Sequence, residues 1–168
     1  MARWVARKDG SLALGAQRFP LAEGKGGRIA ADQKQEGDGA TPIGVWPLRR
    51  VYYRPDRLAP PQTALPLVPL RPHDGWCDDP ADPLYNRPVS LPYRASHERL
   101  WRDDEVYDLI VEIGHNDDPP VPGLGSAIFV HIAREGFTPT EGCIALTLAD
   151  LITALAAATP DSLLEIEG

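Results

Sequence analysis

The sequence predicts one mainly-β domain over residues 1–168, a sandwich or barrel with one C-terminal helix and long proline-rich loops. Most of its apolar runs are short, and turn residues separate them at close intervals, as in sandwiches and barrels. A chain of 168 residues is long enough for one domain with a hydrophobic core. Only one segment combines a clear helix start with an apolar-rich run, and it lies near the C-terminus.

The first third of the chain reads as strands joined by tight turns. Apolar runs at 3–6 and 11–14 flank an Asp-Gly dipeptide, which indicates a hairpin. The glycine-rich segment 24–28 lacks the spacing of nucleotide-binding loops, so it predicts a turn between strands. An apolar stretch follows at 43–53, and Pro47 within it indicates that part of this strand lies at a sheet edge.

The middle of the chain, residues 54–92, carries many of the 18 prolines and predicts few long helices or strands. A segment of this length without regular structure is uncommon unless it is ordered or functional. Apolar anchors within it favour ordered loops packed on the sheet over a flexible linker. These anchors are Leu65, Leu67, Val68, Leu70, Trp76, Tyr85 and Val89. Asp78, Asp79 and Asp82 have no His partner at ligand spacing, so they predict turn or capping roles and no metal site.

The last third predicts one short helix, three strands and one longer helix. Residues 96–101 read as a short helix with the leading Ser as its cap. Residues 106–113 form the clearest strand, and 127–132 form another. A sequence similar to a capping box opens the longer helix, which runs over about 147–157, and a last strand follows at 163–166.

Charge and hydropathy narrow the possible partners. The net charge of −7 argues against nucleic acid, because phosphate binding depends on clustered Lys and Arg. The first residues show neither an apolar core nor a cleavage site of a signal peptide. No run approaches the roughly 20 apolar residues of a membrane span. We therefore expect a cytoplasmic protein, or a periplasmic one if a leader was removed.

The candidate chemistry lies in two apolar runs near the C-terminus. The first contains His131, and twelve positions later Cys143 follows Gly142 and begins the second. A thiol is a strong nucleophile only as thiolate, and a neighbouring imidazole commonly generates it. Two strands joined by a short polar loop bring both side chains to one end of a sheet. Gly142 permits a sharp turn that aims the N–H groups of Gly142 and Cys143 at an oxyanion.

Structural interpretations of these residues remain open. A free Cys at the start of an apolar run is often a small buried hydrophobe, and a His beside a strand is often structural. Cys77 and Cys143 permit one disulfide, which would block a thiol nucleophile and is disfavoured in a reducing compartment. We interpret Cys77 as structural.

Thr140-Glu141-Gly142-Cys143-Ile144 resembles the Ser/Thr-His-Gly-Cys-Ile/Val signature of the L,D-transpeptidase catalytic domain, the YkuD family. The stretch 40–46, which begins Ala-Thr-Pro-Ile-Gly, is similar to the strand entry Thr-Pro-x-Gly-x-Phe/Tyr of that family. Blocks at 75–79, 85–86 and 125–129 look like a small branch of the family, so the resemblance covers most of the chain.

The resemblance implies the YkuD-type β fold and a Cys143 thioester formed with a peptidoglycan stem peptide. His131 matches the base of the family, and the main-chain carbonyl of Ile132 matches the group that orients it. The N–H groups of Gly142 and Cys143 would stabilise the oxyanion. No cofactor is implied.

Four further residues are candidates for shaping the cleft or binding substrate. Arg134 is a candidate for the terminal carboxylate of the donor peptide, because Arg pairs with carboxylates in a bidentate manner; a surface role is the alternative. Thr140 is expected to shape the nucleophile turn, and His115 to line the cleft. Glu141 either polarises His131 or is a solvated loop carboxylate.

The predicted function is that of a cytoplasmic L,D-carboxypeptidase that releases D-alanine from tetrapeptides during cell-wall recycling. Glu141 and Ala145 replace residues that secreted members carry beside the nucleophile. Together with the expected lack of a leader, they point to water as acceptor. A periplasmic cross-linking transpeptidase and a non-catalytic binder of peptidoglycan fragments are the alternatives. A papain-like hydrolase is disfavoured, because there the Cys usually precedes the His.

Overall fold

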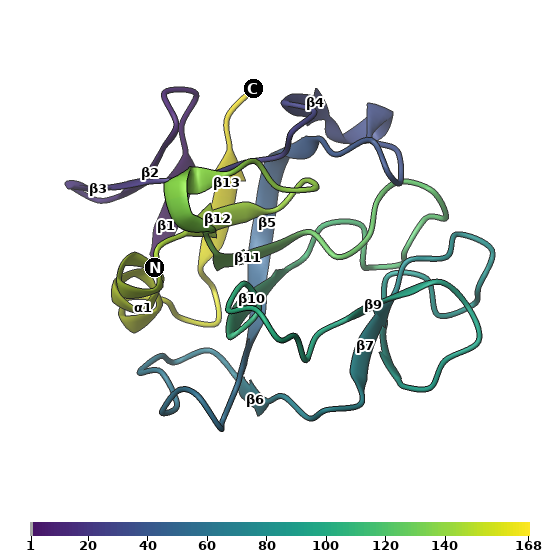
Figure 1. Cartoon of the computed structure of the whole chain (residues 1–168). Coiled ribbons are helices and arrows are strands. Elements are labelled where there is room, and N and C mark those ends of the chain that lie inside the picture. Colours follow the sequence, from purple (N-terminus) through teal and green to yellow (C-terminus); the bar gives the residue numbers. More distant parts are fainter. Residues whose placement is uncertain (1) are drawn as a thin grey trace.

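The computed structural model describes residues 2–168, in which a 10-stranded sheet, a 3-stranded sheet and one α-helix are formed (Figure 1). The predicted mainly-β fold with one C-terminal helix is confirmed. The elements are β1 Arg3–Ala6, β2 Ser11–Leu14, β3 Gln17–Pro20, β4 Arg28–Ala30, β5 Thr41–Tyr53, β6 Leu67–Pro69, β7 Asp74–Cys77, β8 Pro88–Ser90, β9 His97–Arg99, β10 Leu109–Ile113, β11 Phe129–Ile132, β12 Ile144–Leu146, α1 Leu148–Ala156 and β13 Leu163–Ile166.

The large sheet has the order β12-β11-β10-β5-β13-β1-β2-β3, and β4 and β6 also pair with β5. β1 and β2 form the predicted hairpin, closed by a hydrogen bond from Arg7 N–H to Ser11 O of 2.8 Å. β1 also pairs in parallel with β13, so strands from the two ends of the chain are neighbours in the sheet.

The expectation that Pro47 marks an edge strand is wrong, because β5 is central to the sheet. The part of β5 up to Pro47 pairs with β13, and the part from Leu48 onward pairs with β10. Pro47 thus sits where the strand changes partner, beside an irregularity at Ile113. Its carbonyl still accepts a hydrogen bond from Gly114 N–H at 2.8 Å. A proline is tolerated here because the ladder is already interrupted.

The predicted short helix at 96–101 is also wrong, because residues 97–99 form β9. This strand pairs with β7, with Cys77 opposite His97. The Ser96 hydroxyl donates to Asp78 at 2.6 Å instead of capping a helix. Pairing with a strand distant in sequence overrides the local preference of a segment this short.

The proline-rich middle segment is ordered, as expected. It contributes only the short strands β6, β7 and β8, and most of its apolar anchors are buried. The exceptions are Leu67, which is 36% exposed, and Val68, which is half-buried. Asp79 and Asp82 accept hydrogen bonds from backbone N–H groups two residues further along, which are the turn roles that their sequence context predicted.

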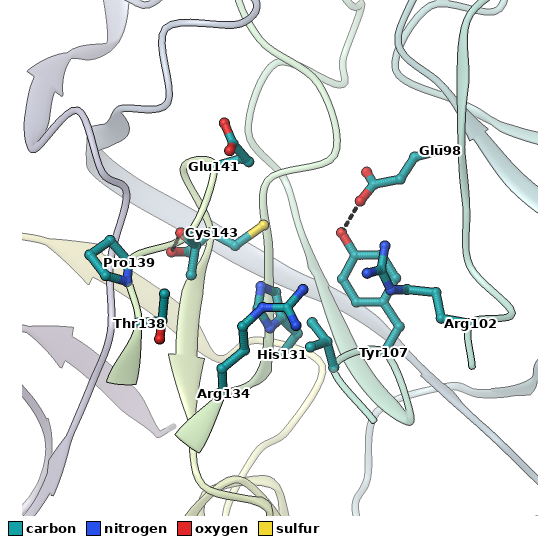
Figure 2. Close-up of a pocket in the computed structure, with 11 residues that line it drawn as sticks. Glu98, Arg102, Tyr107, His131, Arg134, Thr138, Pro139, Glu141 and Cys143 are labelled. Carbon is teal, nitrogen blue, oxygen red and sulfur yellow. Dashed lines mark hydrogen bonds between the residues drawn. The ribbon is translucent and has the colours of Figure 1, made fainter. Parts of the chain in front are cut away.

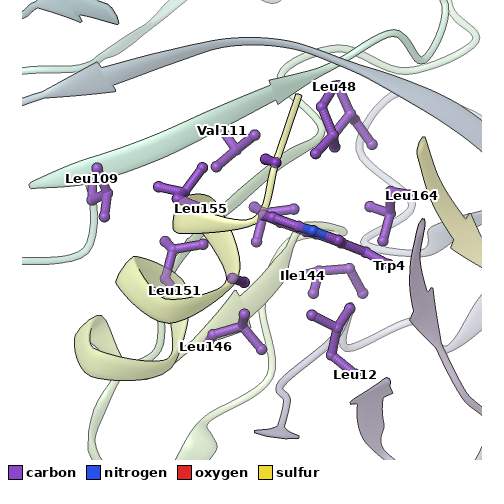
Figure 3. Packing of buried hydrophobic residues seen from close by; sticks show 14 of the residues in the cluster. Trp4, Leu12, Leu48, Leu109, Val111, Ile144, Leu146, Leu151, Leu155 and Leu164 are labelled. Atoms are coloured by element: carbon purple, nitrogen blue, oxygen red, sulfur yellow. The ribbon is translucent and has the colours of Figure 1, made fainter. Parts of the chain in front are cut away.

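One face of the large sheet packs against α1 (Figure 3). The helix begins at Thr147, whose hydroxyl accepts a hydrogen bond from Asp150 N–H as an N-cap. Leu151 and Leu155 of the helix are fully buried in this core, together with Trp4 of β1. Among residues 2–168, no helix is both long and apolar enough to cross a membrane.

The opposite face carries a second core, under the small sheet and the middle loops. Side chains alternate between the faces of a strand, so Val130 and Ile132 of β11 enter the helix-side core while Phe129 enters the second one. His131 has the same parity as Phe129 and therefore lies on this second face. Cys143 packs in the same core as Phe129, which places both candidate catalytic residues on one side of the sheet.

Candidate active site

His131 and Cys143 are brought together by the parallel pairing of β11 and β12. Val130 lies opposite Ile144, so Cys143, one residue before β12, lies beside Phe129. The Phe129 N–H reaches the Cys143 sulfur at 3.3 Å. Both candidate side chains line one cavity of about 180 Å³, shown in Figure 2.

His131 is held as a neutral imidazole, and within residues 2–168 one of its nitrogens has no hydrogen-bond partner. Its Nδ1 lies 2.9 Å from the carbonyl oxygen of Ile132, which is the arrangement that the family resemblance implied for Ile132. A carbonyl only accepts, so Nδ1 carries the proton and Nε2 keeps its lone pair. Burial lowers the pKa of His131 to about 4, and the imidazole is therefore neutral near neutral pH.

The Cys143 thiol is held in its neutral form. It donates to the carbonyl oxygen of Ala127 at 3.2 Å and is 6% exposed. Burial, and then the negative charge of Glu98, raise its pKa to about 12. A thiol and an imidazole that are both neutral make no preformed ion pair.

Two threonine hydroxyls hold the turn that precedes Cys143. The Thr140 hydroxyl donates to the carbonyl of Cys143 at 2.6 Å and accepts the Gly142 N–H at 3.1 Å. The Thr41 hydroxyl donates to the carbonyl of Gly142 at 2.9 Å and accepts the Gly24 N–H at 2.9 Å. The expected role of Thr140 in shaping this turn agrees with these contacts. Thr41 links the two sequence motifs, which are about 100 residues apart.

Gly142 is required for its backbone conformation and lacks the free N–H that was expected of it. Its φ of +127° is strained for any residue with a Cβ, and an added Cβ would lie 2.8 Å from the carbonyl oxygen of Ala40. Its N–H is already bound by Thr140, which removes it as an oxyanion donor. Within residues 2–168, the N–H of Cys143 has no acceptor in hydrogen-bonding range and is the available donor.

Two arginine side chains lie at one side of the cavity. Arg134 and Arg102 both line it, and both contact the carboxylate of Asp104, at 3.5 Å and 2.7 Å. Two guanidinium groups therefore share the Asp104 carboxylate, and the carboxyl of Glu98 lines the same cavity near Arg102. The Arg134 side chain is 51% exposed and free to turn toward a ligand.

Sequence reasoning missed Glu98 and Tyr107, which line the wall facing the nucleophile. The Tyr107 ring packs edge-on against His131 with ring centres 5.4 Å apart, and its hydroxyl donates to Glu98 (Figure 2). Burial raises the pKa of Glu98 to about 7. The incorrect helix at 96–101 concealed Glu98, and nothing local to Tyr107 distinguishes it from a core residue.

A second cavity, of about 250 Å³, adjoins Cys143 and is lined by Lys34, Glu36, Glu98 and Glu141, among others. Glu141 lines both cavities, and its carboxylate binds Lys25 at 2.8 Å. Within residues 2–168, Glu141 forms no hydrogen bond or ion pair with His131. The solvated-loop interpretation of Glu141 therefore fits better than polarisation of the base.

His115 is not among the residues that line either cavity. It is buried and packs edge-on against Trp46, with ring centres 4.9 Å apart. Burial lowers the pKa of His115 to about 4. The structure thus separates His115 from the cleft that it was expected to line, and the expectation from the sequence is corrected.

The sequence model of the L,D-transpeptidase catalytic domain (YkuD) matches residues 3–166. The chain belongs to this family. Members are cysteine-dependent enzymes that act on peptidoglycan peptides. The matched range 3–166 includes both Cys143 and His131, the two candidate residues that line the same cavity.

Similar solved structures are also L,D-transpeptidases, although the likeness is distant. L,D-transpeptidase 1 of Mycobacterium tuberculosis shows 15% identity and a TM-score of 0.45, over 99% of this chain and 59% of that one. An L,D-transpeptidase from Mycobacterium smegmatis shows 12% identity and a TM-score of 0.47, over 99% of this chain and 58% of that one. The chain thus spans about three fifths of the length of these proteins. No curated protein matches it.

Proposed function

We propose that this L,D-transpeptidase-family chain is an L,D-carboxypeptidase that releases D-alanine from peptidoglycan tetrapeptides through a Cys143 thioester. The observation that carries the proposal is the cavity itself. It holds a thiol and a neutral imidazole together, with two guanidinium groups at one side. This arrangement suits cleavage of an amide bond close to a carboxylate.

The reaction begins when Cys143 attacks the carbonyl carbon of the scissile amide and Nε2 of His131 takes the thiol proton. The N–H of Cys143 donates to the developing oxyanion. His131 then gives the proton to the leaving amine, and D-alanine departs, leaving the acyl group on sulfur. A water molecule attacks the thioester, His131 takes its proton, and the thiolate leaves and is reprotonated.

Substrate orientation follows from the charges beside the nucleophile. The leaving D-alanine carries the terminal carboxylate of the tetrapeptide. Arg134 and Arg102 offer it a cationic partner, and Arg134 is held only by a 3.5 Å contact with Asp104. Binding of the carboxylate on this side would place the scissile amide over Cys143.

Water is favoured as acceptor because two positions next to the nucleophile offer no group that recognises a second peptide. Ala145 is fully buried and is bridged to Ala22, so it presents nothing to the cleft. The Glu141 carboxylate is bound by Lys25. Action on soluble fragments in the cytoplasm is part of this proposal, and fractionation of cells that produce the native protein tests it.

The experiment is mass spectrometry of products from a purified tetrapeptide, with and without an excess of acceptor amine. The expected products are a tripeptide and free D-alanine, with little dimer. A cross-linked dimer as the main product would show that the chain acts as a transpeptidase and not as a hydrolase. Tight binding without any product would identify a binder. Cys143→Ser is the control for catalysis at this site.

A further inference from the structure

We propose that Asn86 is a positioning residue for the nucleophile. Asn86 fixes the backbone of Ala127, and the Ala127 carbonyl keeps the Cys143 thiol protonated and in place until substrate arrives. The proposal rests on Cys143 being the nucleophile and is independent of the acceptor. The test uses a small alkylating reagent and no peptide. A negative result would therefore contradict the role of Asn86 without bearing on the proposed carboxypeptidase reaction.

Three hydrogen bonds carry the proposal. The Asn86 side-chain oxygen accepts the Ala127 N–H at 3.0 Å. The Ala127 carbonyl in turn accepts the thiol of Cys143 at 3.2 Å. The same Asn86 oxygen accepts Trp76 Nε1–H at 2.9 Å, which fixes the amide from the side of the small sheet. Asn86 thus contacts the backbone N–H of the residue whose carbonyl holds the thiol.

Ala127 needs such an anchor because its backbone is strained. Its φ is +53°, a left-handed conformation that residues with a Cβ adopt rarely. Strained residues of this kind persist where the surroundings over-determine them, and they gather at functional sites. Without the Asn86 contact, relaxation of Ala127 would turn its carbonyl away from the sulfur.

Asn86 is itself fully engaged and buried. Its side-chain N–H groups donate to the carbonyls of Asn116 at 2.7 Å and His115 at 3.2 Å. The residue is 4% exposed. All its hydrogen-bonding capacity is therefore used, half of it in supporting Ala127 and Trp76. The blocks 85–86 and 125–129 that resemble the family branch thus meet in space behind the nucleophile.

The chemical consequence follows from the direction of the thiol hydrogen bond. A carbonyl accepts from a thiol and cannot donate to a thiolate, so it favours the neutral form. Loss of this contact should lower the pKa of Cys143 and speed its reaction with electrophiles near neutral pH. The site would then be more reactive in the absence of substrate.

The test compares the pH profile of iodoacetamide alkylation in a Cys77→Ser background, which leaves Cys143 as the single thiol. Asn86→Leu removes the acceptor for Ala127 and should speed alkylation at pH 7 by up to about tenfold, one unit of thiol pKa. The charged and titratable groups that line the two cavities beside the thiol are unchanged in Asn86→Leu: His131, Tyr107, Glu98, Glu141, Arg102, Arg134, Lys34, Glu36 and Asp78.

Tyr85→Phe is the control for general loosening of the same loop. The Tyr85 hydroxyl accepts the Gly125 N–H at 3.0 Å and donates to Glu36, but within residues 2–168 it forms no hydrogen bond with Ala127. Its loss should lower the thermal midpoint without speeding alkylation. Equal acceleration in Tyr85→Phe would overturn the proposal, as would an unchanged profile in folded Asn86→Leu.

A measurement on the Cys77→Ser parent keeps the proposal testable if Asn86→Leu does not fold. The infrared S–H stretch of Cys143 should lie at the lowered frequency of a thiol that donates to a carbonyl. A band at the frequency of a free thiol would contradict the proposal directly.

Discussion

Replacement of Thr41 by Val should damage both stability and catalysis, although Thr41 touches neither substrate nor nucleophile. Thr41 is fully buried, and its hydroxyl is bonded to the carbonyl of Gly142 and the N–H of Gly24. Valine has nearly the same shape but neither donates nor accepts. Thr41→Val therefore leaves two buried backbone groups without partners.

The magnitude follows from these two groups. An unsatisfied buried donor or acceptor costs about 1–3 kcal/mol, so the free energy of unfolding should fall by about 2–6 kcal/mol. That is a large part of the about 5–15 kcal/mol by which domains are stable. Thr41→Ser keeps the hydroxyl and removes one methyl group, and it should cost only about 0.5–1.5 kcal/mol.

Urea unfolding of wild type, Thr41→Val and Thr41→Ser measures the difference, and the acylation rate of Cys143 reports on the turn. The acylation rate of Cys143 should be at least about tenfold lower in Thr41→Val than in Thr41→Ser, because the Gly142 carbonyl is free to rotate once the hydroxyl is lost. Equal stability and equal acylation in the two variants would refute the role assigned to the Thr41 hydroxyl.

Three more outcomes are expected. Arg134→Ala should raise the KM for a tetrapeptide several-fold, through loss of about 1 kcal/mol at this half-exposed site, and leave kcat nearly unchanged; an unaltered KM would remove Arg134 from carboxylate binding. Glu98→Gln should lower the pKa of Cys143, seen as faster alkylation at pH 8, because ionised Glu98 opposes the thiolate; slower alkylation would contradict this. The pKa of His115 is lowered from 6.5 to about 4, so its contribution to stability is complete above pH 6.5 and is lost as pH falls toward 4. Between pH 7 and pH 5, the free energy of unfolding measured with urea should fall more steeply in wild type than in His115→Phe, by up to about 1.4 kcal/mol per pH unit. Parallel profiles would show that His115 is not buried in its neutral form.

The sequence predicted that His131 and Cys143 lie close together at one end of the sheet, because the determinants of this placement are local. Cys143 follows a glycine that only a sharp turn explains, and His131 lies on the preceding strand. The parallel register of β11 and β12 then aligns them. The N-cap at Thr147 and the first hairpin were predictable for the same reason, since capping and turn residues act within a few positions of themselves.

The parts that sequence reasoning missed depend on contacts between distant segments. Residues 97–99 form a strand only because β7 lies beside them, and Glu98 reaches the cavity only in that strand. Pro47 is tolerated in a central strand because the strand that pairs with β5 changes there, from β13 to β10. Asn86 lies 41 positions from Ala127, and no local pattern predicts their contact.

The intact mass of the enzyme, trapped early in its reaction with tetrapeptide, tests the central claim most directly. The account predicts an added mass equal to the tripeptide acyl group, mapped to Cys143. The adduct should form in wild type and in Cys77→Ser and be absent from Cys143→Ser. Product release without any adduct on Cys143, or an adduct on Cys77, would contradict the account.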